Sequence, residues 1–593
     1  MKNFIKTTLA TVTGLIIFSF AVIFMTAGII GAAAALGNKQ PVMPAKAMLT
    51  VNMSTLMFCE QTKEADALSM LQSGGQTVAM LGIRDAITAI NKAATDPAVQ
   101  FIYMRPDGMA SDVAYLEEFR TAIDNFRKSG KAVVSYIENP TNGSYYLASA
   151  SDKVYMTPYD GGINMFTGLS SQLIFLKDIL DKVGVNIQLI RHGKYKSAGE
   201  MFIRSSSSKE NMEQNEAMVS SMWNSWAEQI ADSRGITVER LDDILNNLEL
   251  ELPSDWLNTG LVDALLTREQ LQQQLCNLYI SSNYGNVKSI SLQDYAKLNT
   301  SVVLPVAKKK IAVIYADGNI VDGSDNTQVA GDRFANIISD VRRDTTVKAV
   351  VLRVNSPGGS VLAAEKIKAE IDLLQKRVPV IASFGNYAAS GGYWISACSD
   401  KIYADATTLT GSIGVFSIIP DFSGTLNKKL HVNVTPVNSN RHADMYNCLR
   451  PLTKAETAYM QATVESVYQR FTSLVAEGRD MTIDQVENLA QGRVWTGAEA
   501  VENGLVDEIG NIEDAIMYAA LSIDGVTRLD QVQIAEYPKP LTTLEMLMES
   551  LNGSTPSVLA GTPFENIEAA FSTINATETG KTYARLPYEY IIR

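Results

Sequence analysis

The sequence holds two copies of one unit, each of roughly 250 residues. Residues 152–155 (DKVY) return 248 positions later as residues 400–403 (DKIY), and residues 260–265 (GLVDAL) return 244 positions later as residues 504–509 (GLVDEI). Backwards from the first motif the offset of 248 holds without a gap, and it pairs Asp96 with Asp344, Arg105 with Arg353, and Ser135 with Ser383. We therefore expect the chain to build one fold twice, with the boundary between residues 299 and 304.

Each copy alternates strand patterns with helix patterns. In the second copy, residues 311–315 are an apolar strand pattern, and residues 349–354 carry the β-branched run of a strand buried in a parallel sheet. A loop at 355–360 (NSPGGS), a helix over 361–375 and a strand over 378–383 are predicted to follow. This alternation predicts an α/β fold with a parallel sheet and crossover helices.

An uncharged stretch over residues 7–37 precedes the first copy. It is longer than the ~20 residues that cross a bilayer and longer than the ~7–15 apolar residues of a secretory signal. We therefore predict an uncleaved N-terminal transmembrane helix, although the small residues at 32–35 leave cleavage open. Lys2 and Lys6 precede the stretch, which favours a cytoplasmic N-terminus and places the remaining chain outside the cytoplasm.

The predicted organisation has four parts. They are a cytoplasmic tip and membrane anchor over residues 1–37, a first copy over 38–300, a second copy over 301–540, and a C-terminal extension over 541–593. The sequence assigns no role to the extension.

Charge and cysteine usage argue against two kinds of binding site. The net charge is −13 and no long basic run is present, so we do not expect nucleic-acid binding. The four cysteines lie in no CxxC pair and have no histidine at ligand spacing: Cys59, Cys276, Cys398 and Cys448. We therefore expect no metal site, and no cofactor.

The two copies differ at a serine and at a glycine loop. Ser390, in 386-NYAASGGYWIS-396, aligns with Asn142, so the first copy has lost the hydroxyl. Residues 355–360 (NSPGGS) align with residues 107–112 (DGMASD), which lack the glycine pair. Both differences indicate that any reaction that uses this serine and this glycine loop takes place in the second copy.

A lysine motif shows the opposite difference. Residues 191–202 (RHGKYKSAGEMF) correspond to residues 438–447 (NSNRHADMYN), where an alanine or an aspartate stands opposite Lys196. A lysine of the first copy and a serine of the second could together make one site, with neither copy sufficient alone.

Ser390 is the candidate nucleophile, and a serine hydroxyl attacks well only when a base removes its proton. Histidine is the usual base, and the chain has three, none in a recognisable triad setting: His192, His431 and His442. Lysine, with an ordinary pKa near ~10.4, is the alternative where burial lowers that pKa by several units. The apolar company of Lys196 fits such a site, whereas Lys194 would face the other way in a strand.

Hydrolysis also needs donors for the negatively charged oxygen of the tetrahedral intermediate. Backbone N–H groups of glycines serve well, because no Cβ blocks close approach. Gly358 and Gly359 are the candidate donors, together with Gly391 beside the serine. Ser412, which aligns with Asn164, could hold the lysine amine in position.

These motifs together resemble the signal peptide peptidase A family, also called protease IV, in its long duplicated bacterial form. The residues that carry the resemblance are 355-NSPGGS-360, 387-YAASGGYWIS-396, 408-TLTGSIGVF-416, 191-RHGKYKSA-198 and 493-RVWTGAEAVENGLVDEIG-510. The resemblance implies two ClpP/crotonase-like units. It also implies that Ser390 is the nucleophile, that Lys196 is the general base and that Ser412 orients its amine.

The same resemblance implies where the protein works. Members of this family are anchored in the bacterial inner membrane, face the periplasm and assemble into homo-oligomers, for which a tetramer is the family expectation. They cleave the signal peptide remnants that signal peptidase releases. We therefore expect peptide substrates, and contact with membrane lipid through the N-terminal helix.

Two other functions compete with a peptidase. A crotonase-like acyl-CoA enzyme could use the same fold, but it needs no nucleophilic serine. An inactive membrane scaffold would not need the serine, the lysine and the glycine loop, all of which are intact.

Overall fold

The computed structural model describes residues 6, 11, 13–20, 41–63, 78–108, 111–299, 309–539 and 580–586. The predicted membrane-crossing segment, residues 7–37, lies outside this description except for residues 11 and 13–20, which are helical and exposed. Among the described residues, no helix combines the length and the apolar character that crossing a bilayer requires.

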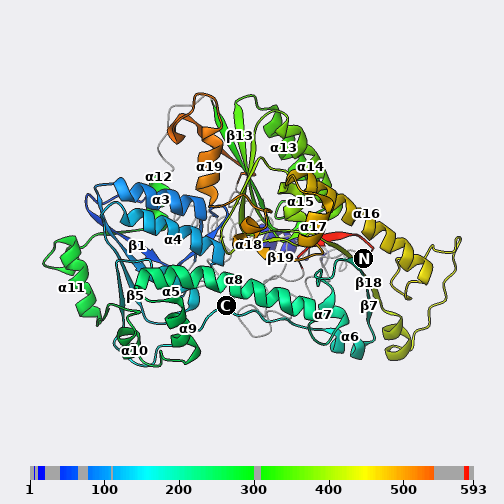
Figure 1. Cartoon of the computed structure of the whole chain (residues 1–593), viewed down its shortest axis with the longest axis horizontal. Helices are drawn as coiled ribbons and strands as arrows, with labels where there is room; N and C mark the ends of the chain where they lie inside the picture. The colour runs from blue at the N-terminus through cyan, green and yellow to red at the C-terminus, as the bar shows by residue number, and fades with distance from the viewer. Residues whose placement is uncertain are drawn as a thin grey trace.

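The first copy builds a six-stranded sheet in which every pair of neighbours is parallel. Its order is β8 (Ala264–Leu265), β6 (Lys153–Met156), β5 (Val133–Ile137), β4 (Val99–Arg105), β1 (Ala47–Asn52) and β9 (Ser289–Ser291). Helices α3 (Ile83–Thr95) and α4 (Val113–Arg127) connect its strands and pack on it (Figure 1).

The second copy builds an eight-stranded sheet that is parallel except at β19. Its main path is β19 (Val494–Thr496), β17 (Leu409–Gly411), β15 (Val380–Ala389), β13 (Val347–Ser356), β10 (Lys310–Asp317) and β21 (Gln533–Tyr537). Off this path, β16 (Lys401–Ala404) pairs with β15 and with β20 (Glu508–Ile509).

A third sheet joins the two copies. It has six strands in the order β12 (Val329–Ala330), β11 (Ile320–Val321), β14 (Gly358–Ser360), β22 (Tyr583–Arg585), β18 (Val415–Asp421) and β7 (Asn186–His192). Strand β7 belongs to the first copy, and it pairs antiparallel with β18 of the second copy. This pairing brings Lys196, which follows β7, to the serine-bearing copy.

Helix packing also crosses between the copies. The largest hydrophobic core includes Ile102 and Phe119 of the first copy together with Val351 and Ile516 of the second. Helix α8 (Lys209–Arg234) extends in Figure 1 from α5 (Asn142–Ala148) toward α7 (Glu200–Ile203), and passes beneath β19 of the second copy. The two units therefore share one apolar interior rather than meeting only at a linker.

The ends of the long helices follow local chemistry. Helix α8 begins after Ser208, whose hydroxyl accepts the Asn211 N–H, and it ends at Gly235 with φ 67°. Helix α16 (Lys454–Gly478) begins at Thr453, which forms a reciprocal capping pair with Glu456.

The structure confirms the α/β prediction and corrects one element of it. The predicted helix at 361–375 is α14 (Val361–Gln375), and the strand predicted at 378–383 lies largely within β15. Residues 355–360, predicted as a loop, are mostly strand, because β13 continues through Ser356 and β14 covers Gly358–Ser360. The reason is long-range: β14 pairs with β11 and with β22 near the C-terminal end, which no local pattern reveals.

Candidate active site

Ser390 lies where β15 ends and α15 (Gly391–Ser396) begins. Its backbone has φ 55° and ψ −110°, a conformation that residues with a side chain rarely adopt. The Ser390 amide donates to the Gly411 carbonyl of β17 at 2.8 Å, and the Trp394 amide donates to the Ser390 carbonyl at 2.8 Å. The chain therefore turns sharply at this serine, and two fixed hydrogen bonds hold the turn.

Lys196 reaches this serine from the first copy. Its Nζ lies 2.8 Å from Ser390 Oγ within the same chain. The lysine follows β7 in a tight turn, in which the Lys196 amide donates to the Gly193 carbonyl at 3.3 Å. Arg191 donates to the Lys196 carbonyl at 2.7 Å. The structure thus brings together two predicted residues that are 194 positions apart in sequence.

The surroundings of Lys196 favour the neutral amine. The residue is 0% exposed, and burial lowers the pKa of Lys196 well below its ordinary value. Lys196 Nζ donates to the Ser412 carbonyl at 3.0 Å and to Ser412 Oγ at 2.9 Å. Those two acceptors engage the two N–H groups of a neutral amine, so its lone pair is left facing the Ser390 hydroxyl.

Two glycines, Gly193 of the first copy and Gly492 of the second, leave room for the lysine turn. A Cβ on Gly492, which has φ 80°, would lie 2.5 Å from the Cβ of Lys196. A Cβ on Gly193 would lie 2.4 Å from the Gln491 carbonyl oxygen, and the Tyr195 amide donates to that oxygen at 2.9 Å. Gly492 was not predicted from the sequence, because the motif that resembles the family begins at residue 493. The signal that could have identified it is its position directly before that motif.

The three glycines predicted as oxyanion donors lie beside the serine turn. Gly358 has φ 97°, and a Cβ on it would lie 2.6 Å from the Gly391 nitrogen. A Cβ on Gly359 would lie 1.9 Å from the Ile320 carbonyl oxygen. Side chains are therefore excluded at both positions, and the backbone itself lies beside the serine turn. The Gly358 N–H donates to Ser356 Oγ at 3.2 Å.

Gly358→Ala is expected to lower kcat by about 10²-fold or more, because the added methyl group clashes with the Gly391 amide and displaces an oxyanion donor. The matched control is Gly323→Ala, since Gly323 also has a positive φ of 83° but nothing lies within 4 Å of its Cβ position. Steady-state kinetics on one peptide compare the two variants. Equal activity in both would contradict a role for Gly358 beyond its backbone conformation.

The other sequence candidates lie elsewhere. His192 Nδ1 is 2.6 Å from Glu465 and its ring stacks on Tyr468, and His442 Nδ1 is 2.9 Å from Glu456. His431 is exposed. Lys194 is also exposed, with its Nζ over the Tyr195 ring. None of these contacts involves Ser390.

In the first copy, the residues that align with Ser390 and Ser412 are Asn142 and Asn164, and both form hydrogen bonds within loops. Asn142 accepts the N–H groups of Thr167 and Gly168 and donates to the Gly168 carbonyl. Asn164 donates to the Leu250 carbonyl and accepts the Phe166 N–H. Both asparagines therefore hold loops where the second copy has Ser390 and Ser412.

A cavity of about 380 Å³ opens next to the glycine strand and the serine turn. Residues of both copies line it, among them Asp112, Val113, Met222, Asn319, Pro357 and Tyr387. Pro357 directly precedes the glycine pair, whereas Ser390 and Lys196 are not among the lining residues.

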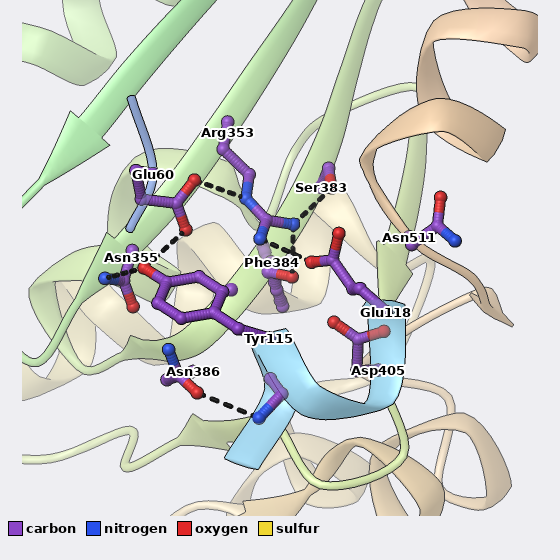
Figure 2. A network of polar contacts seen from close by, with 12 residues as sticks. Glu60, Tyr115, Glu118, Arg353, Asn355, Ser383, Phe384, Asn386, Asp405 and Asn511 are labelled. Carbon is purple, nitrogen blue, oxygen red and sulfur yellow. Dashed lines mark hydrogen bonds and ion pairs between the residues drawn. The ribbon is translucent and has the colours of Figure 1, made fainter. Parts of the chain in front are cut away.

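A buried ion cluster links the two copies through Arg353 (Figure 2). Arg353 of β13 is 0% exposed, and it donates to Glu60 at 2.8 Å and to Glu118 at 2.5 Å, both from the first copy. It also donates to the Ser383 hydroxyl and the Phe384 carbonyl of β15. Because β13 leads to the glycine pair and β15 to the serine turn, Arg353 fixes the two strands that carry the site. Sequence reasoning missed this role.

Comparison with known proteins places the chain in a peptidase family. The model of peptidase family S49 matches residues 125–279, which contain Lys196, and residues 372–524, which contain Ser390 and Ser412. Protease 4 of Haemophilus influenzae is 35% identical over 494 residues, which cover 81% of this chain and 80% of that protein.

Two further relatives are also proteases by name and are similar over most of the chain. Protease 4 of Salmonella typhi is 35% identical over 487 residues, covering 80% of this chain and 77% of that protein. The chloroplastic serine protease SPPA of Arabidopsis thaliana is 30% identical over 475 residues, covering 79% of this chain and 69% of that protein. The duplicated α/β chain is a serine-type peptidase and belongs to peptidase family S49.

Proposed function

We propose that the chain is a membrane-anchored endopeptidase in which Ser390 is the nucleophile and Lys196 the general base. The observation that carries the proposal is the 2.8 Å separation of Lys196 Nζ and Ser390 Oγ. Both side chains are fully buried, and burial lowers the pKa of Lys196 toward the range in which an amine accepts a proton.

The reaction follows from these positions. Ser390 Oγ attacks the carbonyl carbon of the scissile bond as the Lys196 amine takes the hydroxyl proton. The N–H groups of Gly358, Gly359 and Gly391 stabilise the negatively charged oxygen. Lys196 then gives its proton to the leaving nitrogen, the C–N bond breaks, and a serine ester remains. Water, deprotonated by Lys196, hydrolyses the ester and restores the enzyme.

The proposed substrates are remnant signal peptides and other extended apolar peptides. The resemblance of the motifs supports this substrate class, and so do the apolar residues around the site, which include Met218, Met222 and Leu409. The resemblance and the uncharged stretch at 7–37 support a single-pass anchor in the bacterial inner membrane, with two ClpP/crotonase-like units in the periplasm. A homo-oligomer, with a tetramer as the family expectation, is part of the same proposal.

An assay of the full chain in detergent micelles tests the substrate class. We expect rapid hydrolysis of a synthetic signal peptide and slow hydrolysis of a peptide of equal length in which charged residues replace the apolar run. Mass spectrometry of the products identifies the cleaved bonds, and the Ser390→Ala variant controls for contaminating proteases. Faster hydrolysis of the charged peptide would contradict a preference for apolar substrates.

A further inference from the structure

Gln214 of helix α8 lies between the two backbone segments that surround the lysine amine. Its side chain is buried, with 1% exposed. Its Oε1 accepts the Val494 N–H of β19 at 3.1 Å. Its Nε2 lies 3.4 Å from the Tyr195 carbonyl oxygen and 3.3 Å from Ser197 Oγ, on the two neighbours of Lys196 in sequence. One buried side chain therefore joins the lysine turn of the first copy to a strand of the second copy.

The partners of Gln214 fix the orientation of its amide. The Val494 N–H requires the oxygen on one side, and the Tyr195 carbonyl requires the NH₂ group on the other side. Asn211 Oδ1, one turn earlier on α8, is a third acceptor at 3.4 Å from Nε2. An ionised glutamate could not donate here, and a methionine has no N–H at all. The site therefore uses both the donor and the acceptor of a glutamine.

The peptide bond between Arg493 and Val494 connects Gln214 with the acceptors of the lysine amine. The Val494 N–H donates to Gln214, and the Arg493 carbonyl accepts the Ser412 N–H at 2.6 Å. Ser412 in turn accepts the Lys196 amine through its carbonyl and its hydroxyl. A ring of hydrogen bonds and peptide bonds thus runs from the backbone beside Lys196, through Gln214, to the groups that hold its Nζ.

Helix α8 gives Gln214 a fixed base, because the helix is docked on β19. Met218, one turn after Gln214, packs with Val494 in one apolar cluster. Ser221 Oγ lies 2.7 Å from Thr496 Oγ1 of the same strand. A side chain on a packed helix holds its neighbours more precisely than one on a loop.

From these contacts we propose that Gln214 is a positioning residue for the general base. It sets the spacing between Lys196 and Ser412, and this spacing aims the amine at the Ser390 hydroxyl. Gln214 acts through the backbone on either side of the base, not on the reacting atoms. The inference rests on the proposed function, because it uses the Ser390–Lys196 pair.

Two variants of Gln214 test this role in steady-state hydrolysis of a peptide by the full chain. Gln214→Met removes the amide at nearly the same length, and we expect kcat to fall by ~10²-fold with KM nearly unchanged, because a base displaced by about 1 Å transfers the proton poorly. Gln214→Glu keeps the acceptor, loses the donor and adds a negative charge near the amine. That charge favours the protonated amine, so we expect kcat/KM to rise at a higher pH than in the wild type.

Gln229→Met is the matched control on the same helix. Gln229 Oε1 accepts the Tyr146 hydroxyl at 2.8 Å within the first copy. This variant also loses a buried hydrogen bond of α8, so we expect a lower melting temperature but the wild-type kcat and pH profile. Calorimetry gives the temperature below which all the variants are folded, and the kinetics are compared there.

The outcomes separate the positioning role from the proposed function. Wild-type kcat and pH profile in both Gln214 variants, with Lys196→Met inactive, overturn the positioning role alone. A higher KM with unchanged kcat also overturns it, and so does an equal fall of kcat in Gln229→Met. If Gln214→Met does not fold, Gln214→Glu decides, because it keeps the shape of the side chain. A wild-type chain that hydrolyses no peptide overturns the proposed function.

Discussion

Replacing Lys196 with methionine is expected to abolish peptide hydrolysis and, at the same time, to raise the thermal stability of the chain. Without the amine, nothing at that position accepts the Ser390 proton, so we expect kcat/KM to fall by about 10⁴-fold or more, as in Ser390→Ala. Methionine fills nearly the same volume. It also removes the free-energy cost of burying an amine that is charged in the unfolded chain.

The pH dependence of both effects follows from the lowered pKa of Lys196. The neutral amine is the base, so wild-type kcat/KM is expected to rise with pH through that lowered pKa. Between the lowered pKa and the ordinary value of 10.5, the unfolded chain binds more protons at this site than the native chain does. The free energy of unfolding therefore rises with pH in this window, and the stability advantage of Lys196→Met shrinks as pH increases.

Lys194→Met is the matched control, since Lys194 is two residues away and exposed. It is expected to keep its activity and its melting temperature. Steady-state kinetics and calorimetry at several pH values compare the three chains. Normal activity in Lys196→Met would exclude this lysine as the base, and loss of activity in Lys194→Met would move the base to that residue.

The comparison of the two copies predicted much of the candidate site. Asn142 at the position of Ser390 showed which copy had kept a hydroxyl, and the lysine motif at 191–202 showed where a partner could come from. These inferences need only types of residue and an offset. The sequence could not give the distance between Lys196 and Ser390, because that distance depends on the antiparallel pairing of β7 with β18.

Features that form between distant segments could not be predicted either, because they also depend on long-range pairing and packing. The glycine loop became strand β14 because β11 and β22 supply hydrogen-bond partners on its two sides. Gly492 packs on Lys196 from the other copy. The offset did pair Arg105 with Arg353, but it could not show which of these arginines is buried.

Arg353 stands in a group with more acids than bases (Figure 2). Burial raises the pKa of Glu60 to about 7, although Arg353 lowers it. Burial also raises the pKa of Asp405 well above its ordinary value, and the charges of Glu118 and Glu117 add to the effect. Burial therefore favours the protonated form of these two carboxyl groups, and Arg353 donates to Glu60 and to Glu118.

Arg353→Met is therefore expected to lower the free energy of unfolding by about 3–5 kcal/mol, because it leaves the Glu60 and Glu118 carboxyl groups buried without a partner. Activity is expected to fall as well, since β13 and β15 lose the group that ties them to the first copy. Denaturant titration followed by tryptophan fluorescence gives the stability, and peptide hydrolysis gives the activity.

The duplication supplies the matched control, Arg105→Met. Arg105 pairs with Glu138 at 2.6 Å, but its side chain is 41% exposed, so losing this ion pair is expected to cost at most about 1 kcal/mol.

Adding Glu60→Gln and Glu118→Gln to Arg353→Met removes the unpaired charges, and we expect part of the lost stability to return. Equal losses in Arg353→Met and Arg105→Met would show that the buried cluster does not hold the two copies together. A greater loss at Arg353 would mean that the same aligned residue became a surface ion pair in one copy and the link between both copies in the other.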